Sequence, residues 1–361
     1  MNILWLNHRD PNHPKAGGAE RTMYEITKRL VQTGNKVTIY CPKWHGADDE
    51  VFLDGIRIIR KGNSLTTHLI LPIFLLKNHF DIVINDLAHG IPWISSVFLQ
   101  RKNLIFFRHL HARSLNGQVN FLFAKIIISI EKLYPFFYRN LKVVTESSTS
   151  ENDLIKLGFL KKNIVRIPPG IDLNLFSLGE KTENVQLIYF GGLRRYKRPE
   201  FVLKVFELLK NHINGLKIVV TGEGKLLEKI KKEALSKNYN IIFLGKIDQK
   251  ELAKLIRESW INLHFSVTEG WGLSIIEASA SGTPSVAFKV PGIVDTIFEG
   301  HNGFLTEDIY EFKNLVLKII SNEDFYIKES RNIAERFSWD TTAKNWNDLI
   351  NETYRKQIRN K

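Results

Sequence analysis

Short apolar runs alternate with amphipathic stretches along almost the whole chain. The run Met1–Asn7 is followed by Ala19–Thr33, where apolar residues recur at helical spacing until Gly34, a residue that favours a helix end. Buried strands that alternate with helices are typical of parallel sheets covered by helices on both faces. The pattern therefore predicts an α/β protein. Further strands of this first sheet are expected at Val37–Cys41, Ile82–Asn85, Leu104–Arg108, Val143–Thr145 and Ile164–Pro168.

The alternation stops at Pro168-Pro169-Gly170 and starts again at Gln186–Phe190. A second cycle predicts a second sheet, so we expect two doubly wound, Rossmann-like domains that meet near residues 170–185. Ligands of such sheets bind beyond the carboxyl ends of the strands, so two facing sheets are expected to share one cleft. The second cycle comprises strands at Lys217–Thr221, Ile241–Leu244, Ile261–Phe265 and Ser285–Phe288, and helices at Glu200–Lys210, Lys225–Ser236 and Lys250–Glu258.

The composition is that of an ordinary globular protein. Of 361 residues, 43% are hydrophobic and 25% are charged, which excludes a disordered chain. The single cysteine, Cys41, has no partner for an internal disulfide, which favours a reducing compartment. The longest apolar run, Leu69–Leu76, is shorter than the ~18 residues of a spanning helix, and the opening run Ile3–Leu6 is too short for the apolar region of a signal peptide, so neither is expected. A cytoplasmic protein is expected.

The charge is strongly positive. The chain has 51 lysines and arginines against 38 acids, a formal net charge of +13. This excess favours an anionic partner such as a nucleotide or an acidic lipid surface. The sequence contains no zinc-finger spacing, no RNP-like motif and no long basic helix, which argues against nucleic acid. The acidic run Asp48-Asp49-Glu50 has no second cluster at ligand spacing, so it is interpreted as a solvated loop, and no metal site is predicted.

The segment Glu269–Glu277 (EGWGLSIIE) carries the most specific chemical signal. It lies where a predicted strand gives way to a helix, and Gly270 and Gly272 let the backbone approach a ligand closely. The free N–H groups of a helix start attract an anion. Glu277, one turn into the helix, is placed to bind ribose hydroxyls, and Glu269 is placed to bind a sugar. This arrangement predicts a nucleotide-sugar site; the competing interpretation is one capping and one solvated carboxylate.

Three further loops at strand ends support the prediction. Gly17-Gly18, between the first strand and the first helix, offers backbone amides to the other wall of the cleft. The loop Gly191–Lys197 (GGLRRYK) supplies cations for a departing diphosphate, where charge develops as the bond breaks. Gly222-Glu223-Gly224 closes the next strand–helix turn. Each also has a plainer interpretation, as a helix-start glycine pair, a surface position for Lys197, or an ordinary turn.

Together these motifs resemble family 4 glycosyltransferases of the GT-B fold along essentially the whole chain. The most diagnostic part is Glu-x7-Glu with its Gly-Trp-Gly-Leu insert, followed by Gly282-Thr283-Pro284. The resemblance implies a retaining, metal-independent transfer from a nucleoside-diphosphate sugar to a saccharide acceptor, with no cofactor. It implies that residues 1–172 bind the acceptor, that residues 173–338 bind the donor, and that a helix in 339–361 packs back on the first domain. Other motifs in the expected order are Gly17-Gly18-Ala19-Glu20, Pro169-Gly170-Ile171-Asp172, Gly222-Glu223-Gly224 and Gly303-Phe304-Leu305.

The resemblance also assigns roles to residues. It implies that Glu269 contacts the transferred sugar, Glu277 the ribose and Lys197 the diphosphate, while Gly245–Ile247 passes near the nucleobase. The implied catalytic residues are His109, His111, Glu269 and Lys197, and the implied donor-binding residues are Gly17, Gly18, Gly192, Arg194, Arg195, Gly222, Gly224, Ile247, Gly270, Trp271, Gly272, Leu273 and Glu277.

Two positions leave alternatives open. The family usually has Gly-Arg-Leu where this chain has Gly191-Gly192-Leu193, so its phosphate-binding arginine is missing, and Arg194 or Arg195 is expected to replace it. Family members often carry a histidine at the end of the fourth strand of the N-terminal domain. Here both His109 and His111 are candidates, and a histidine that merely caps the strand is the alternative.

A membrane-facing surface is a further expectation. Phe121–Tyr138 is dense in Phe, Ile and Tyr, with Lys125 and Lys132 interspersed, and together with Leu69–Leu76 it is suited to the interface of an anionic membrane. The acceptor is then a polyprenol-linked saccharide at the cytoplasmic membrane face. A helix buried in the packing layer of the sheet is the competing interpretation.

Three other functions compete with sugar transfer. A dinucleotide-dependent oxidoreductase is disfavoured because no G-x-G-x-x-G follows either opening strand. A nucleic-acid-binding protein is argued from charge alone and leaves the paired glutamates without a role. A nucleotide-sugar epimerase or hydrolase on the same scaffold differs in needing no acceptor.

Overall fold

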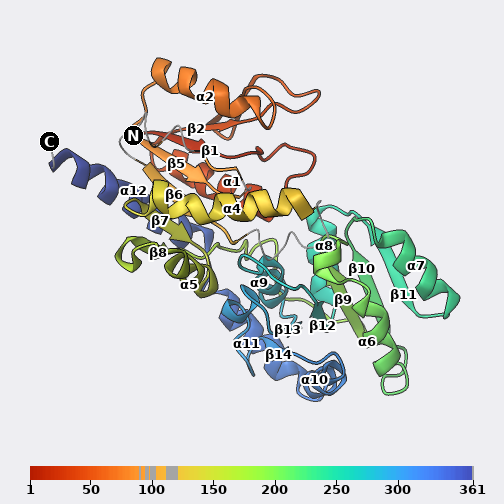
Figure 1. The fold of residues 1–361 in the computed structure, drawn as a ribbon. Helices are drawn as coiled ribbons and strands as arrows, with labels where there is room; N and C mark the ends of the chain where they lie inside the picture. The colour runs from red at the N-terminus through yellow and green to blue at the C-terminus, as the bar shows by residue number, and fades with distance from the viewer. Residues whose placement is uncertain (89–90, 94–96, 98–102, 111–120, 360–361) are drawn as a thin grey trace. The chain divides into compact units, whose positions relative to one another are not determined.

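The structure is a computed structural model, and it describes residues 1–88, 91–93, 97, 103–110 and 121–359. The chain divides into two compact units, one formed by residues 1–170 together with 339–361 and the other by residues 171–338 (Figure 1). Each unit contains a mostly or wholly parallel sheet with helices packed on it. The predicted α/β class with two Rossmann-like sheets is therefore confirmed.

The sheet of the first unit has the strand order β3-β4-β2-β1-β5-β6-β7-β8. Every neighbouring pair is parallel except β3 and β4, which are antiparallel. The central strands are buried on both faces, as continuous apolar strands of parallel sheets are. The strands are β1 (Asn2–Leu6), β2 (Lys36–Cys41), β3 (Glu50–Leu53), β4 (Ile56–Arg60), β5 (Ile82–Asp86), β6 (Asn103–Phe107), β7 (Lys142–Thr145) and β8 (Ile164–Arg166).

The helices of the first unit cover both faces of this sheet. On β1, Trp5 belongs to the core shared with α1 and α12 and lies 5.1 Å from the ring of Trp346, whereas Leu6 belongs to the core under α2. On β6, Phe106 packs on Trp346, whereas Phe107 belongs to the core under α4. Since successive strand residues face opposite ways, α1 and α12 cover one face and α2 and α4 cover the other. The helices are α1 (Gly18–Gln32), α2 (Thr66–Lys77), α4 (Phe121–Tyr138), α5 (Ser148–Leu157) and α12 (Trp339–Arg359).

The second unit contains a six-stranded parallel sheet of order β11-β10-β9-β12-β13-β14. The loops that follow β9, β10, β12 and β13 leave the carboxyl edge of this sheet, which is where parallel α/β sheets bind ligands. The strands are β9 (Gln186–Phe190), β10 (Lys217–Thr221), β11 (Ile241–Gly245), β12 (Ile261–His264), β13 (Ser285–Phe288) and β14 (Gly303–Thr306). The helices are α6 (Phe201–Leu209), α7 (Leu227–Ser236), α8 (Gln249–Glu258), α9 (Leu273–Ala280), α10 (Glu311–Ile320) and α11 (Glu323–Ala334).

The hairpin β3–β4 departs from the expected pattern. Asp48-Asp49-Glu50 was interpreted as a solvated loop, but Glu50 is the first residue of β3. Asp54 and Gly55 join the two strands with φ angles of 48° and 79°, and two left-handed residues are what the tight hairpin turn between twisted strands requires. The predicted strands Leu104–Arg108 and Ile164–Pro168 also end early, at Phe107 and Arg166.

Within the described part of the chain, no helix combines the length and the apolar character that crossing a bilayer requires.

Candidate active site

The site in the second unit is built on the loop between β12 and α9. Glu269 lies in this loop, and its backbone N–H donates to the carbonyl of Pro291, 3.0 Å away, in the loop after β13. Gly292 allows this close approach, because a Cβ there would lie 2.3 Å from the Glu269 carbonyl oxygen, and its φ of 82° is left-handed. The two loops therefore fix the backbone from which the Glu269 side chain extends.

The carboxylate of Glu269 meets two side chains, one from the loop after β9 and one from the end of β12. Its Oε1 forms an ion pair with Nζ of Lys197, and the same oxygen lies 3.4 Å from Nε2 of His264. The three side chains are mostly buried, with 20% of Lys197, 15% of Glu269 and 6% of His264 exposed. The structure thus brings together the two predicted residues Lys197 and Glu269, and the plainer interpretation of Lys197 as a surface lysine is wrong.

Charge pairing controls the ionisation of this group. Burial alone would raise the pKa of the Glu269 carboxyl, but the cation of Lys197 and the contact with His264 hold that pKa well below its usual range. Burial alone would likewise lower the pKa of Lys197, and the Glu269 carboxylate raises it instead. Both groups are therefore charged at neutral pH, and the pair presents a polar, preorganised surface at the carboxyl edge of the sheet.

Arg198, which the sequence did not single out, holds the Lys197 loop in place. Its φ of 47° is left-handed, and its guanidinium donates to the carbonyls of Phe265 (2.6 Å) and Ser266 (3.0 Å), just after β12. The same guanidinium lies 4.3 Å from the ring centroid of Phe288. Arg198 therefore fastens the loop that carries Lys197 to the loop that carries Glu269.

The start of α9 has the geometry expected of an anion-binding helix end. Gly272 precedes the helix with a left-handed φ of 97°, and a Cβ there would lie 2.7 Å from Cδ1 of Ile293. The first N–H groups of a helix have no acceptor within it and carry partial positive charge. Glu277 lies on the second turn and is buried, whereas Gly270 and Leu273 are half-buried. Trp271 is buried against Phe337, with ring centroids 5.5 Å apart, so it anchors the loop.

The glycines after β10 have a packing role in the structure. A Cβ on Gly222 would lie 1.8 Å from the Gly191 carbonyl oxygen, and one on Gly224 would lie 2.1 Å from that of Leu193. The N–H of Leu193 also donates to the carbonyl of Glu223 at 2.8 Å. The loops after β9 and β10 therefore lie backbone against backbone, which only glycine permits.

Gly192 is different, because nothing in the unit requires a glycine there. A Cβ at this position would meet only the side chain of Arg194, at ordinary contact distances of 3.6–3.8 Å. Arg194 and Arg195 are exposed, and neither forms an ion pair with a described residue. Ile247, in the loop after β11, is half-buried.

A second cluster of predicted residues lies at the carboxyl edge of the first unit's sheet. Gly17 and Gly18 begin α1, both are exposed, and the N–H of Gly17 donates to Oε2 of Glu20 at 2.7 Å. His109 follows β6 and is half-buried. The other predicted histidine, His111, lies outside the described residues.

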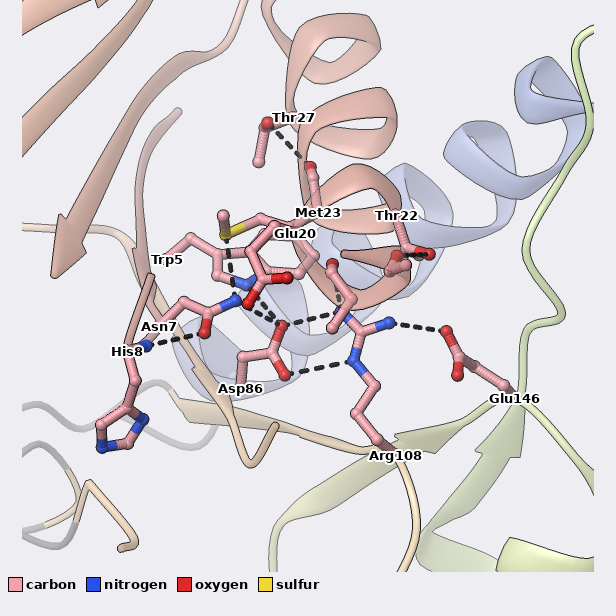
Figure 2. A network of polar contacts seen from close by, with 12 residues as sticks. Trp5, Asn7, His8, Glu20, Thr22, Met23, Thr27, Asp86, Arg108 and Glu146 are labelled. Atoms are coloured by element: carbon pink, nitrogen blue, oxygen red, sulfur yellow. Dashed lines mark hydrogen bonds and ion pairs between the residues drawn. The ribbon is translucent and has the colours of Figure 1, made fainter. Parts of the chain in front are cut away.

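Arg108 connects the strand ends around these residues (Figure 2). Its guanidinium donates twice to Asp86, the last residue of β5, at 2.9 and 3.2 Å, and once to Glu146, just after β7, at 2.6 Å. A fourth bond of 3.1 Å reaches the carbonyl of Ala19 in the first turn of α1. All three charged side chains are buried, so Arg108 holds the start of α1 against the ends of three strands.

A metal site is not formed by the described residues, among which no three or more His, Cys, Asp or Glu side chains are grouped as ligands.

Each of the two units matches a family of glycosyltransferases. The family described as "Glycosyl transferases group 1" matches residues 171–337, and the family described as "Glycosyltransferase Family 4" matches residues 16–175. Together the two matches span residues 16–337. A probable sucrose-phosphate synthase of Thermosipho melanesiensis is 28% identical over 94% of this chain and 91% of its own length. An uncharacterized glycosyltransferase of Methanocaldococcus jannaschii is 28% identical over 61% of this chain and 53% of its own length. The match to other curated relatives covers between 27% and 62% of their length.

Solved structures show the same fold. The sucrose-phosphate synthase of Thermosynechococcus elongatus superposes with a TM-score of 0.78 at 20% identity, covering 100% of both chains. Anabaena HepE in complex with UDP-glucose superposes with a TM-score of 0.75 at 18% identity, covering 98% of this chain and 100% of that one.

Proposed function

Since the chain belongs to glycosyltransferase family 4, we propose that it is a retaining, metal-independent transferase that moves a hexose from a nucleoside-diphosphate sugar to a saccharide or polyprenol-linked saccharide. The observation that carries this proposal is the buried pairing of Glu269 with Lys197 beside the start of α9. This arrangement brings a carboxylate, a cation and a helix N-terminus together, which are the groups that a nucleotide sugar would need. The solved complex of HepE with UDP-glucose supports a nucleotide-sugar donor for this fold.

Each residue has a defined task in the proposed reaction. Glu269 accepts hydrogen bonds from the transferred sugar, and Glu277 accepts them from the ribose. Lys197, together with Arg194 or Arg195, neutralises the diphosphate, assisted by the N-terminus of α9. In the first unit, the backbone at Gly17 and Gly18 would approach the donor, with the N–H of Gly17 already bonded to Glu20, and the ring of His109 or His111 would lie near the reacting sugar.

In the proposed reaction, one bond at the anomeric carbon breaks and another forms. The bond between the anomeric carbon and the phosphate oxygen breaks, and its electron pair leaves with the diphosphate. The acceptor hydroxyl oxygen forms the new bond on the same face, and its proton passes to the leaving phosphate. The protein's contribution is to stabilise the negative charge that develops on the diphosphate and the oxocarbenium-like sugar. No side chain is required as a nucleophile.

A donor screen tests this function. The protein is mixed with UDP-, GDP- and ADP-sugars, with NAD and with an oligonucleotide, and unfolding is followed by thermal shift. We expect stabilisation by one class of nucleotide sugar only, since a ligand that binds the folded state raises the melting temperature. Stabilisation by NAD or the oligonucleotide alone would contradict the proposal. Turnover of the sugar nucleotide that needs no added acceptor and leaves an epimer would favour the epimerase instead.

We also propose that the first unit contacts an anionic membrane through its α2 and α4 face. Both helices cover the same face of the sheet, and they expose an apolar-basic surface. On α2, apolar side chains are both buried and exposed, so the helix has no polar face, which is unusual for a helix that meets water. The exposed members of this surface are Leu69, Ile73, Leu76 and Lys77 on α2, and Lys125, Ile126, Lys132, Leu133 and Phe136 on α4; the six apolar ones are each more than half exposed.

The charge of this surface favours anionic lipid. Among the described side chains of α2 and α4 the sole acid is Glu131, and it is buried, so the exposed charges of these two helices are positive. A basic-apolar helix face is typical of interfacial helices, whose apolar side chains enter the headgroup region while lysines bind anionic lipid. An acceptor with a polyprenol anchor would be presented at the same surface.

Vesicle binding tests this surface. We expect co-sedimentation with phosphatidylglycerol vesicles at low salt, and weak binding to phosphatidylcholine vesicles. The double variant Lys125→Gln/Lys132→Gln is expected to bind about 30-fold more weakly, at about 1 kcal/mol for each lysine. Lys231→Gln/Lys232→Gln, which removes two exposed lysines of α7, is the matched control and should bind like the parent. Equal loss in both variants would show that only net charge matters and would overturn the assignment to α2 and α4.

A further inference from the structure

His264 occupies a position that packing alone does not explain. It ends β12 with 6% of its side chain exposed, and the neighbouring strands β9 and β13 are both hydrogen-bonded to β12. A buried polar ring in such a place costs free energy unless it is hydrogen-bonded. Its Nε2 lies 3.4 Å from Oε1 of Glu269 and 3.5 Å from Oγ of Ser266, while its Nδ1 is buried without a partner among the described residues.

These contacts define the state of the ring. Burial lowers the pKa of His264 and outweighs the neighbouring Glu269 carboxylate, which raises it. The cations of Lys197 and Arg198 lower that pKa further, so the ring is neutral at neutral pH. A neutral imidazole carries one proton. Since Nδ1 faces no acceptor, the proton belongs on Nε2, where the charged Glu269 oxygen is the better of the two acceptors. At 3.4 Å this contact is at the long end of hydrogen-bond distances.

The two oxygens of Glu269 are used unequally. Lys197 approaches Oε1 from the loop after β9 and His264 approaches it from the end of β12, whereas Oε2 has no hydrogen-bond partner within the described chain. With one oxygen held from two sides, the carboxylate has little freedom to rotate, and the second oxygen keeps its lone pairs for a ligand. The two contacts at Oε1 therefore fix the orientation of the carboxylate, which a single contact with a flexible lysine would not do.

We propose that His264 is a positioning residue, which holds Oε1 of Glu269 so that Oε2 is presented to the hydroxyl groups of the donor sugar. This inference rests on the proposed function for the task of Oε2. The contact between His264 and Glu269 itself is independent of that function, and the two can be tested separately.

Ring spectroscopy tests the contact without any donor. In protein labelled with ¹⁵N-histidine, His264 is assigned by its loss in His264→Gln. We expect a neutral ring protonated at Nε2, and a shift of the Nε2–H signal in Glu269→Gln. A ring protonated at Nδ1, or a signal that ignores Glu269→Gln, overturns the inference whatever the protein's activity.

Kinetics test the consequence, with UDP-glucose as the donor. His264→Leu, which removes the donor group, is expected to lower kcat about 10- to 100-fold while the KM for UDP-glucose changes less than about threefold, because a misplaced group impairs the reacting geometry more than binding. His264→Gln, which can place an N–H near the Nε2 position, should recover most of the rate. His301→Leu is the matched control, since it removes an exposed His–Glu329 pair of 2.8 Å in the same unit.

The outcomes separate the role from simple stability. Melting temperatures measured alongside must show that each variant is folded. If His264→Leu and His264→Gln have the same melting temperature and the same rate, both lower than those of the parent, His264 has only a structural role and the proposal fails. If no variant or parent turns over UDP-glucose although the Nε2–H contact is found, the proposed donor fails and the positioning contact stands.

Discussion

Glu269→Gln is expected to slow sugar transfer by about 100- to 1000-fold, the loss that follows removal of one preorganised electrostatic contact in an active site. The amide keeps the shape of the side chain but removes the charge that pairs with Lys197 and that, in the proposed function, faces the donor sugar. Initial rates at saturating donor are the measurement. Because Lys197 keeps its cation, donor binding should weaken much less than kcat falls.

Two controls make this result interpretable. Glu307→Gln changes an exposed carboxylate of the same unit and should leave the rate within about twofold of the parent. The pKa of Glu269 lies well below its usual range, so the rate of the parent should show no titration of this group above about pH 5. If Glu269→Gln retains at least half of the parent rate, Glu269 is not part of the catalytic site.

Arg108→Met is expected to lower the free energy of unfolding by about 3–5 kcal/mol, since breaking a buried ion pair from one side leaves uncompensated charge. Asp86 would lose a bidentate partner and Glu146 its single cation, both in the buried interior. Chemical denaturation at pH 7 is the measurement. Arg139→Met, at an exposed position in the same unit, should change stability by less than about 0.5 kcal/mol.

The pH dependence gives this prediction a sign. Burial raises the pKa of Glu146 even with Arg108 present, and without the guanidinium that folded-state pKa rises further. A carboxyl whose pKa is higher in the folded than in the unfolded state binds more protons when folded, so stability increases as the pH falls through the folded-state value. The deficit of Arg108→Met should therefore shrink between pH 7 and about pH 5. Arg108→Lys keeps the charge without the planar fork, so its free energy of unfolding should lie between those of the parent and Arg108→Met. If Arg108→Met is less than about 1 kcal/mol less stable than the parent, the network contributes little to stability.

Much of the fold follows from local sequence pattern, and the exception is instructive. Continuous apolar runs such as Gln186–Phe190 predict buried parallel strands because both faces of such a strand are covered. The hairpin β3–β4 was missed, although Asp54-Gly55 between two apolar segments is a strong hairpin signal. The acidic run Asp48-Asp49-Glu50 at the start of the hairpin is instead typical of a solvated loop. An edge hairpin can carry exposed charges on its strands, so charge there says little about secondary structure.

The sequence predicts individual residues of the site, but it does not predict which of them contact each other. Motif spacing singled out Glu269 and Lys197, which are 72 residues apart, yet no spacing reveals that they form an ion pair. His264 and Arg198 were missed because a single histidine or arginine in a strand–loop segment has no periodic signature. For Arg108 a signal existed: Asp86, Arg108 and Glu146 each stand at the end of an apolar strand, and parallel strand ends meet at one edge.

The last helix has a consequence for how the protein is made. Trp346 of α12 is fully buried in the core of the first unit, beside Trp5 and Phe106, although the whole second unit separates these residues along the chain. During synthesis all the strands of the second unit are translated before α12. Trp5 and Phe106 therefore stay without the cover of Trp346 until α12 has left the ribosome. The unit made first is the one completed last.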